Sequence, residues 1–216
     1  MLRHFWGGSK PGGLINDALE EIYRMLEQEQ EMFEAAANAL MTGQAPQVDV
    51  EKEDEDINVG ERMVRRLVFE HLTVNPEQDL PASLTLIGIV HDVERIGDYS
   101  KSLLELGRLR PSGLHEGGKY ASACDEIRNM IVPMIGQTLK ALRESDPDLS
   151  EDVMRQHREV KKRTDELLEA AMQDTDVHRD AVLYSVGSRF FRRLSAHLSN
   201  IASSIANPFD QLGRDA

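Results

Sequence analysis

The chain has 216 residues, of which 40% are hydrophobic, so it can form one sizeable domain or two small ones without a disulfide to stabilise the core. Its formal net charge of −13 argues against DNA or RNA as a partner, because binding to phosphate backbones needs a basic surface. It has one cysteine, no apolar run near the roughly 20 residues of a membrane-spanning helix and no secretory signal, so we expect a cytoplasmic protein without membrane insertion.

The composition favours helices over sheets, because Leu, Ala, Glu, Arg and Met dominate and only 5% of the residues are aromatic. A Gly/Pro-rich leader covers residues 1–13, and the aromatic pair Phe5 and Trp6 within it either docks on the bundle or a partner or belongs to a disordered tail. Apolar residues then recur with heptad-like spacing and predict a first helix, which ends at Gly43: Leu19, Ile22, Leu26, Phe33, Ala36 and Leu40.

Two more helices are predicted in the first half. The acidic run 51–56 suits a helix amino terminus, and the helix that begins there ends at Asn75-Pro76. Pro81 lies in the first turn of a third helix, which runs to about Leu109. Gly97 lies on the apolar stripe of this third helix, and we expect another helix to approach closely there, since glycine within a helix otherwise costs stability.

The segment 110–118 is rich in helix breakers and divides the chain into two halves. In the second half the pattern predicts helices over about 119–143, from the turn at 145–148 to about 172, and over about 178–206 before Pro208. Connections this short make neighbouring helices antiparallel. We therefore predict an all-α protein with two tandem antiparallel three-helix bundles, residues 14–109 and 119–207, and a C-terminal tail at 208–216.

Acidic residues occupy positions where the helical pattern expects apolar ones. Glu94 and Asp98 are spaced i,i+4 and share one helix face, and Asp54 and Glu61 fall at heptad positions of the second helix. Carboxylates that converge between packed helices need a counter-charge, and a hard, oxygen-seeking cation supplies it; Asn58 could add a carbonyl oxygen. The alternative is that nearby basic residues neutralise these acids in surface ion pairs: Arg62, Arg65 and Arg95.

The segment Ile89-Val-His-Asp-Val-Glu-Arg-Ile-Gly-Asp-Tyr99 resembles the signature of the PhoU family of phosphate-uptake regulators, and Asp54-Glu-Asp-Ile-Asn58 resembles the family's helix-two motif. The resemblance implies tandem three-helix bundles that bind a divalent or ferric ion through these acidic motifs. It also implies a non-enzymatic cytoplasmic regulator of phosphate transport or phosphate signalling, which contacts a transporter subunit or a sensor kinase. A homodimer is left open.

The second half departs from this pattern, because Arg192 and Ala196 stand where Glu94 and Asp98 are expected. We therefore expect a metal site only in the first half. The Arg192 guanidinium is predicted to pair with a carboxylate on the fifth helix. Glu159 is the nearest candidate, and Asp152 or Asp165 are the alternatives if the register shifts.

Two other functions compete with a metal-binding regulator. His91-Asp92 is the dyad of the helical HD phosphohydrolases, with His71 and either Asp98 or Asp125 as further metal ligands. A helical interaction scaffold without metal is the other alternative. His157 and His197 lie in amphipathic helices and are interpreted as packing or surface residues.

Overall fold

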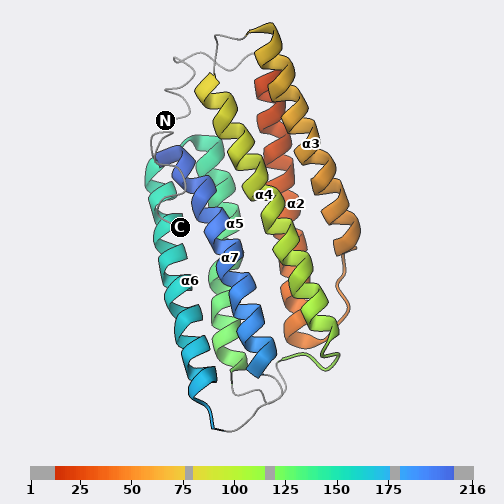
Figure 1. Cartoon of the computed structure of the whole chain (residues 1–216), viewed down its shortest axis with the longest axis vertical. Helices are drawn as coiled ribbons and strands as arrows, with labels where there is room; N and C mark the ends of the chain where they lie inside the picture. Colours follow the sequence, from red (N-terminus) through yellow and green to blue (C-terminus); the bar gives the residue numbers. More distant parts are fainter. Residues whose placement is uncertain (1–12, 76–79, 115–119, 176–180, 207–216) are drawn as a thin grey trace.

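The computed structural model describes residues 13–75, 80–114, 120–175 and 181–206. Within these ranges the regular structure is entirely helical, which confirms the all-α prediction. Figure 1 shows the helices packed side by side along the long axis of the molecule. They are α2 (Leu14–Thr42), α3 (Val50–Val74), α4 (Leu80–Arg108), α5 (Ala121–Glu144), α6 (Pro147–Gln173) and α7 (Ala181–Ala206).

The helix ends lie close to the predicted ones, with one difference between α5 and α6. The predicted turn at 145–148 is shorter, because α6 already begins at Pro147. The Asp146 side chain caps this helix by accepting a hydrogen bond of 3.0 Å from the Leu149 backbone N–H. Proline suits the first helical position, where its missing N–H is not needed.

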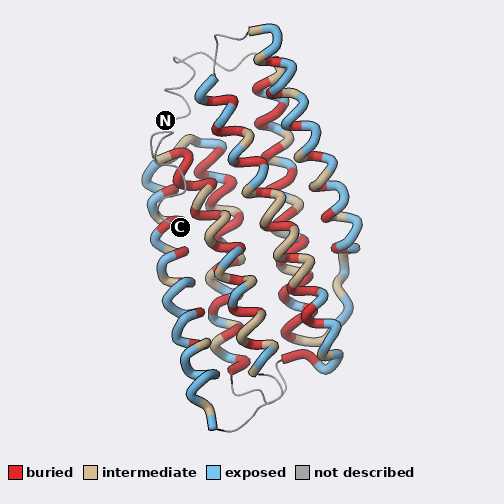
Figure 2. The backbone as a smooth tube through the Cα atoms, in the orientation of Figure 1, coloured by how far each residue is buried: buried red, intermediate tan, exposed pale blue. Residues whose placement is uncertain are grey.

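The helices form two groups that share one interior. Helices α2, α3 and α4 pack against one another, as do α5, α6 and α7, and the contacts of α4 with α7 and of α2 with α5 join the groups. Buried residues line the inward faces of all the helices (Figure 2). None of the helices in the described ranges has an apolar stretch that is long enough to cross a membrane.

The division of the chain into repeats at 14–109 and 119–207 stays a prediction. Several of the features predicted from the sequence lie outside the described residues: Phe5 and Trp6, Pro76, residues 115–118, His178, and the tail at 208–216. The described part of the segment 110–118 is firmly attached to both groups of helices. The Leu114 N–H donates to the Leu40 carbonyl at 3.2 Å, and the Leu114 carbonyl accepts from the Tyr184 hydroxyl at 2.8 Å.

Helix α4 approaches α2 closely at two glycines. A Cβ atom on Gly107 would lie 3.0 Å from the Leu40 Cα, so the backbones of the two helices meet there. A Cβ atom on Gly97 would lie 2.7 Å from the Glu29 Oε1. The close approach that the sequence predicts at Gly97 is therefore made by a side chain of α2, and the backbone contact lies further along α4.

We expect Gly107→Ala to lower the free energy of unfolding by about 1–3 kcal/mol, because the new methyl group meets backbone atoms that cannot rotate away. Gly88→Ala is the matched control in the same helix, since nothing lies within 4 Å of a Cβ placed there. The control should raise the free energy of unfolding by about 0.4–1 kcal/mol. Urea denaturation measures both values, and equal effects would contradict the close contact at Gly107.

Candidate metal centre

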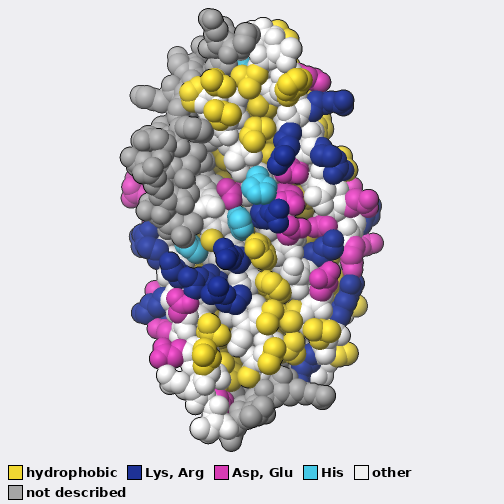
Figure 3. Space-filling view, viewed as in Figure 1, with side chains coloured by type: hydrophobic (Ala, Val, Ile, Leu, Met, Phe, Trp, Pro, Cys, Tyr) yellow, Lys and Arg dark blue, Asp and Glu magenta, His cyan; other side chains and the backbone are white. Residues whose placement is uncertain are grey.

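The predicted acidic residues line the contact between α3 and α4, which we call the acidic seam: Asp54, Glu61, Glu94 and Asp98. Asp54 is buried and the other three are half-buried. In the space-filling view, histidine, acidic and basic side chains gather at mid-height of the molecule, over α4 and its neighbours (Figure 3). The helical spacing of the four residues brings their carboxylates toward one stripe between the two helices.

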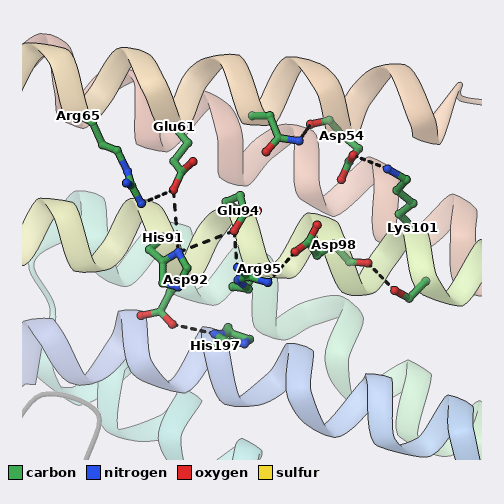
Figure 4. A network of polar contacts seen from close by, with 12 residues as sticks. Asp54, Glu61, Arg65, His91, Asp92, Glu94, Arg95, Asp98, Lys101 and His197 are labelled. Carbon is green, nitrogen blue, oxygen red and sulfur yellow. Dashed lines mark hydrogen bonds and ion pairs between the residues drawn. The ribbon is translucent and has the colours of Figure 1, made fainter.

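Three side chains of the acidic seam region come together as potential metal ligands. Glu61, His91 and Glu94 each offer one ligand atom, and these atoms lie within 4.8 Å of one another. The His91 Nδ1 is 3.9 Å from a Glu61 oxygen and 3.8 Å from a Glu94 oxygen (Figure 4). Burial raises the pKa of Glu94, and the charge of Asp98 raises it further. A cation at this point would relieve both effects.

His91 was not among the ligands predicted for the metal-binding regulator and entered only as part of the phosphohydrolase dyad, although the sequence contains a signal for its place beside Glu94. His91 and Glu94 are spaced i,i+3 on α4, so their side chains share a helix face. Imidazole and carboxylate together suit ions such as Zn²⁺, Fe²⁺ and Mn²⁺.

The other predicted ligands make different contacts. Asp54 accepts a hydrogen bond of 2.9 Å from the Lys101 ammonium, and Asp98 accepts one of 2.9 Å from Arg95. The Asn58 amide donates to the Asp54 backbone carbonyl at 2.9 Å. Neither Asp54 nor Asp98 belongs to the group of three within the described residues. A single cation that is held by all five predicted residues therefore stays a prediction.

Basic residues also neutralise the acidic seam, as the ion-pair interpretation expected. Arg65 contacts Glu61 at 2.7 Å, and the Arg95 Nε lies 3.3 Å from a Glu94 oxygen. Arg95 therefore contacts both carboxylates of its own helix, Glu94 and Asp98 (Figure 4). Because the Arg65 and Arg95 side chains are about half exposed, these pairs contribute little stability.

One acidic residue near the acidic seam was not predicted from the sequence to lie there. Glu29 on α2 is 0% exposed, and no side chain among the described residues hydrogen-bonds to its carboxylate. Burial raises its pKa well above the usual range, the charges of Asp54, Asp98 and Glu94 act in the same direction, and the backbone of Gly97 acts in the opposite one. The heptad pattern of Leu19, Ile22, Leu26, Phe33 and Ala36 expects an apolar residue at position 29, and that break in the pattern was the available signal.

The opposite side of α4 carries a polar contact with α7. The Asp92 Oδ1 lies 2.7 Å from the His197 Nδ1 and accepts a hydrogen bond of 3.0 Å from Asn200. His91 faces α3 whereas its neighbour Asp92 faces α7 (Figure 4). An HD phosphohydrolase needs this histidine and aspartate at the same metal, so the arrangement opposes that hypothesis.

The second group of helices has an ion pair at the predicted place. Arg192 on α7 contacts Asp165 on α6 at 2.5 Å, which confirms the pairing of Arg192 with the fifth helix. The first-named partner was wrong, because Glu159 instead contacts Arg163 one turn along α6, at 3.1 Å. The Asp165 side chain is more than half exposed, so this pair stabilises the fold only weakly.

His157 is a packing residue, as the sequence analysis expected. It is buried, and its Nδ1 lies 2.9 Å from the Ser195 Oγ on α7. Since the Ser195 hydroxyl donates to the Arg192 carbonyl at 2.9 Å, the His157 Nδ1 is the donor to Ser195. Burial lowers the pKa of His157 to about 4, and the cationic side chains of Lys161, Arg192 and Arg158 lower it further.

Comparison with known protein families finds a match to the region of the first three helices. Residues 22–106 match the sequence model of the PhoU domain. The chain contains a PhoU domain. The resemblance inferred from the motifs around Asp54 and Glu94 is thereby confirmed, and the matched range includes Glu29, His91 and the whole acidic seam.

The fold of a PhoU protein extends over both groups of helices. The crystal structure of PhoU from Pseudomonas aeruginosa superposes on the chain with a TM-score of 0.74 and 21% sequence identity. The match covers 94% of this chain and 98% of the Pseudomonas protein. No curated protein matches the sequence significantly. The helices beyond the PhoU domain therefore share the fold of that structure.

The buried imidazole of His157 predicts a loss of stability in acid. Between pH 6.5 and about 4 the unfolded chain binds a proton at His157 that the folded chain does not. The free energy of unfolding should therefore fall as the pH drops through this window and be fully retained above it. We expect the wild type to lose about 1–3 kcal/mol more than His157→Gln, measured by urea denaturation across this range. Parallel pH profiles would contradict the burial of a neutral imidazole.

Proposed function

We propose that this protein is a cation-binding regulator of phosphate transport or phosphate signalling, which acts in the cytoplasm by contact with a protein partner. The observation that carries the proposal is the match of residues 22–106 to the PhoU domain, because this range includes the acidic seam. The resemblance names the candidate partners, a phosphate transporter subunit or a sensor kinase. A homodimer stays open as a further association.

The cation proposed for this site is divalent or ferric. Glu61, His91 and Glu94 are the residues best arranged to hold it, and Asp54, Asn58 and Asp98 lie along the same seam. A bound cation would remove the mutual repulsion of the carboxylates. Without it, their negative charge is neutralised by long basic side chains. Oxygen ligands with one imidazole fit several hard or borderline ions, so the donor set does not single out one metal.

Cation binding would change the surface that a partner meets. Arg95 contacts both Glu94 and Asp98, and its side chain is 43% exposed. A cation that takes these carboxylates as ligands competes with the guanidinium for them. Arg95 would then be free to pair with an acidic group of a partner, so that cation occupancy and protein contact become linked.

A metal-free helical scaffold is the second candidate, and the ion pairs along the acidic seam favour it. Arg65, Arg95 and Lys101 already neutralise part of the carboxylate charge. An enzyme is not proposed, because His91 and Asp92 face different helices.

Substitution of both Glu94 and Asp98 by alanine separates the two candidates. If the acidic seam binds a cation, the double variant should bind it at least about tenfold more weakly while its helical circular dichroism persists. Glu105→Ala is the matched control, since it removes an exposed acid from the same helix. Metal content after dialysis measures the effect. An unchanged stoichiometry in the double variant would favour the scaffold.

The partner can be tested by affinity capture from phosphate-replete and phosphate-starved cells, with the full chain as bait. We expect a phosphate transporter subunit or a sensor kinase to be enriched, and the enrichment to differ between the two conditions. The double variant of Glu94 and Asp98 serves as the second bait. Capture of neither class of protein under either condition would contradict the regulatory role.

A further inference from the structure

Helices α6 and α7 carry a group of basic side chains on the surface of an otherwise acidic protein. Among Asp, Glu, Lys and Arg, α7 contains only three arginines: Arg189, Arg192 and Arg193. They are spaced i,i+3 and i,i+4, so they project from one side of the helix. On α6, Arg158 and Lys161 are exposed as well. We call these five residues the basic band.

The two parts of the basic band meet across the contact between α6 and α7. Arg192 of α7 reaches Asp165 of α6, and Lys161 lies one turn before Asp165 on the same side of α6. The buried imidazole of His157 lies close to both parts. Burial lowers its pKa, and the charges of Lys161, Arg192 and Arg158 lower it further. In Figure 3, dark-blue basic side chains accordingly run across both helices.

Most of the basic band has no acidic partner. Arg192 pairs with Asp165, which leaves four side chains without an ion pair or a side-chain hydrogen bond in the described part of the chain: Arg158, Lys161, Arg189 and Arg193. The cations of the first group differ, since Arg65, Arg95 and Lys101 each contact a carboxylate. Like charges that gather without a counter-charge repel one another, so the basic band is complementary to an anion from outside the chain.

The exposure of the basic band and the charge of the whole chain indicate which kind of anion fits. One exposed ion pair contributes little, so the ligand has to contact several of these cations at once. A membrane or a nucleic acid extends beyond the basic band and would face the rest of a chain whose net charge is −13. No exposed large apolar side chain within 158–161 or 189–193 could enter a bilayer. A short acidic segment of a protein contacts the basic band alone.

We propose that the basic band is the docking surface for a short acidic segment of a protein partner. This inference rests on the proposed function, since it gives the protein contact of the regulator a location and a chemistry. Each guanidinium can hold a carboxylate through two hydrogen bonds, and several weak pairs act together. The basic band belongs to the second group of helices and the acidic seam to the first, so the two can be altered separately.

The test measures binding of a rhodamine-labelled peptide, in which glutamate alternates with serine, to the full chain by fluorescence anisotropy at low ionic strength. We expect the wild type to bind this peptide. The double variant Arg189→Glu with Arg193→Glu should bind it at least about tenfold more weakly. Binding should also weaken as salt is added, because the pairs are exposed. A peptide with glutamine in place of glutamate gives the background, and wild-type binding no stronger than this background would overturn the proposal.

Arg62→Glu with Arg66→Glu is the matched control. These two arginines are also exposed and spaced i,i+4 on one helix, α3, so their reversal changes the net charge by the same amount. The control variant should bind the acidic peptide within about twofold of the wild type. Helical circular dichroism verifies that both double variants fold. Equal weakening in the two would mean that the peptide responds only to net charge, and the proposal would fail.

Other occupants of the basic band give different results. One is a membrane: vesicles of equal parts phosphatidylglycerol and phosphatidylcholine would then bind the wild type but not the variant of Arg189 and Arg193, while the acidic peptide binds neither. The other is a second copy of the chain, which would appear in sedimentation as a dimer that this variant dissociates. Either result would overturn the proposal.

Affinity capture separates this inference from the proposed function. As bait, the variant of Arg189 and Arg193 should recover less transporter subunit or sensor kinase than the wild type and the control variant. Equal recovery by all three baits would overturn docking at the basic band and leave the proposed function intact. Recovery of neither class by the wild type would contradict the proposed function, and the peptide titration would then decide the basic band by itself.

Discussion

Carboxylates that face the contact between packed helices have to be neutralised, and this requirement organises the first three helices. Lys101 neutralises the buried Asp54, and Arg65 and Arg95 neutralise the half-buried Glu61, Glu94 and Asp98. The Glu29 carboxylate lies beyond their reach, among apolar side chains and next to Gly97. A proton neutralises it there, because burial raises the pKa of Glu29 well above the usual range.

Helix α4 makes polar or close contacts on three of its sides. One side carries Glu94 and Asp98 toward α3, a second side carries Gly97 toward α2, and a third carries Asp92 toward His197 of α7. A change in the position of α4 therefore alters its contacts with three neighbouring helices, α2, α3 and α7. This gives a physical route from the acidic seam to the second group of helices, which contains no comparable set of carboxylates in its described part.

The sequence predicted the helices well because their apolar periodicity is strong, and Gly43 and Pro81 marked helix ends. Pro147 was predicted to lie in a turn and is instead the first residue of α6. The sequence also placed Glu94 and Asp98 correctly on one helix face. It did not reveal that Lys101 would reach Asp54, because a contact between helices depends on their relative shift along the axis, which periodicity does not fix. Glu29 was missed for another reason. A glutamate is rarely buried, so the break in the heptad pattern at position 29 was not interpreted.

The short stretch around Leu114 has a mechanical consequence. It lies between the two groups of helices along the chain, where a flexible tether would be expected, but Leu114 is 0% exposed and is hydrogen-bonded to residues on both sides. Its backbone is hydrogen-bonded to Leu40 of α2 and to Tyr184 of α7, so it ties the two groups of helices together. Loss of order in one group therefore exposes apolar surface of the other, so the described bundle should unfold as a single cooperative unit and not as two independent halves.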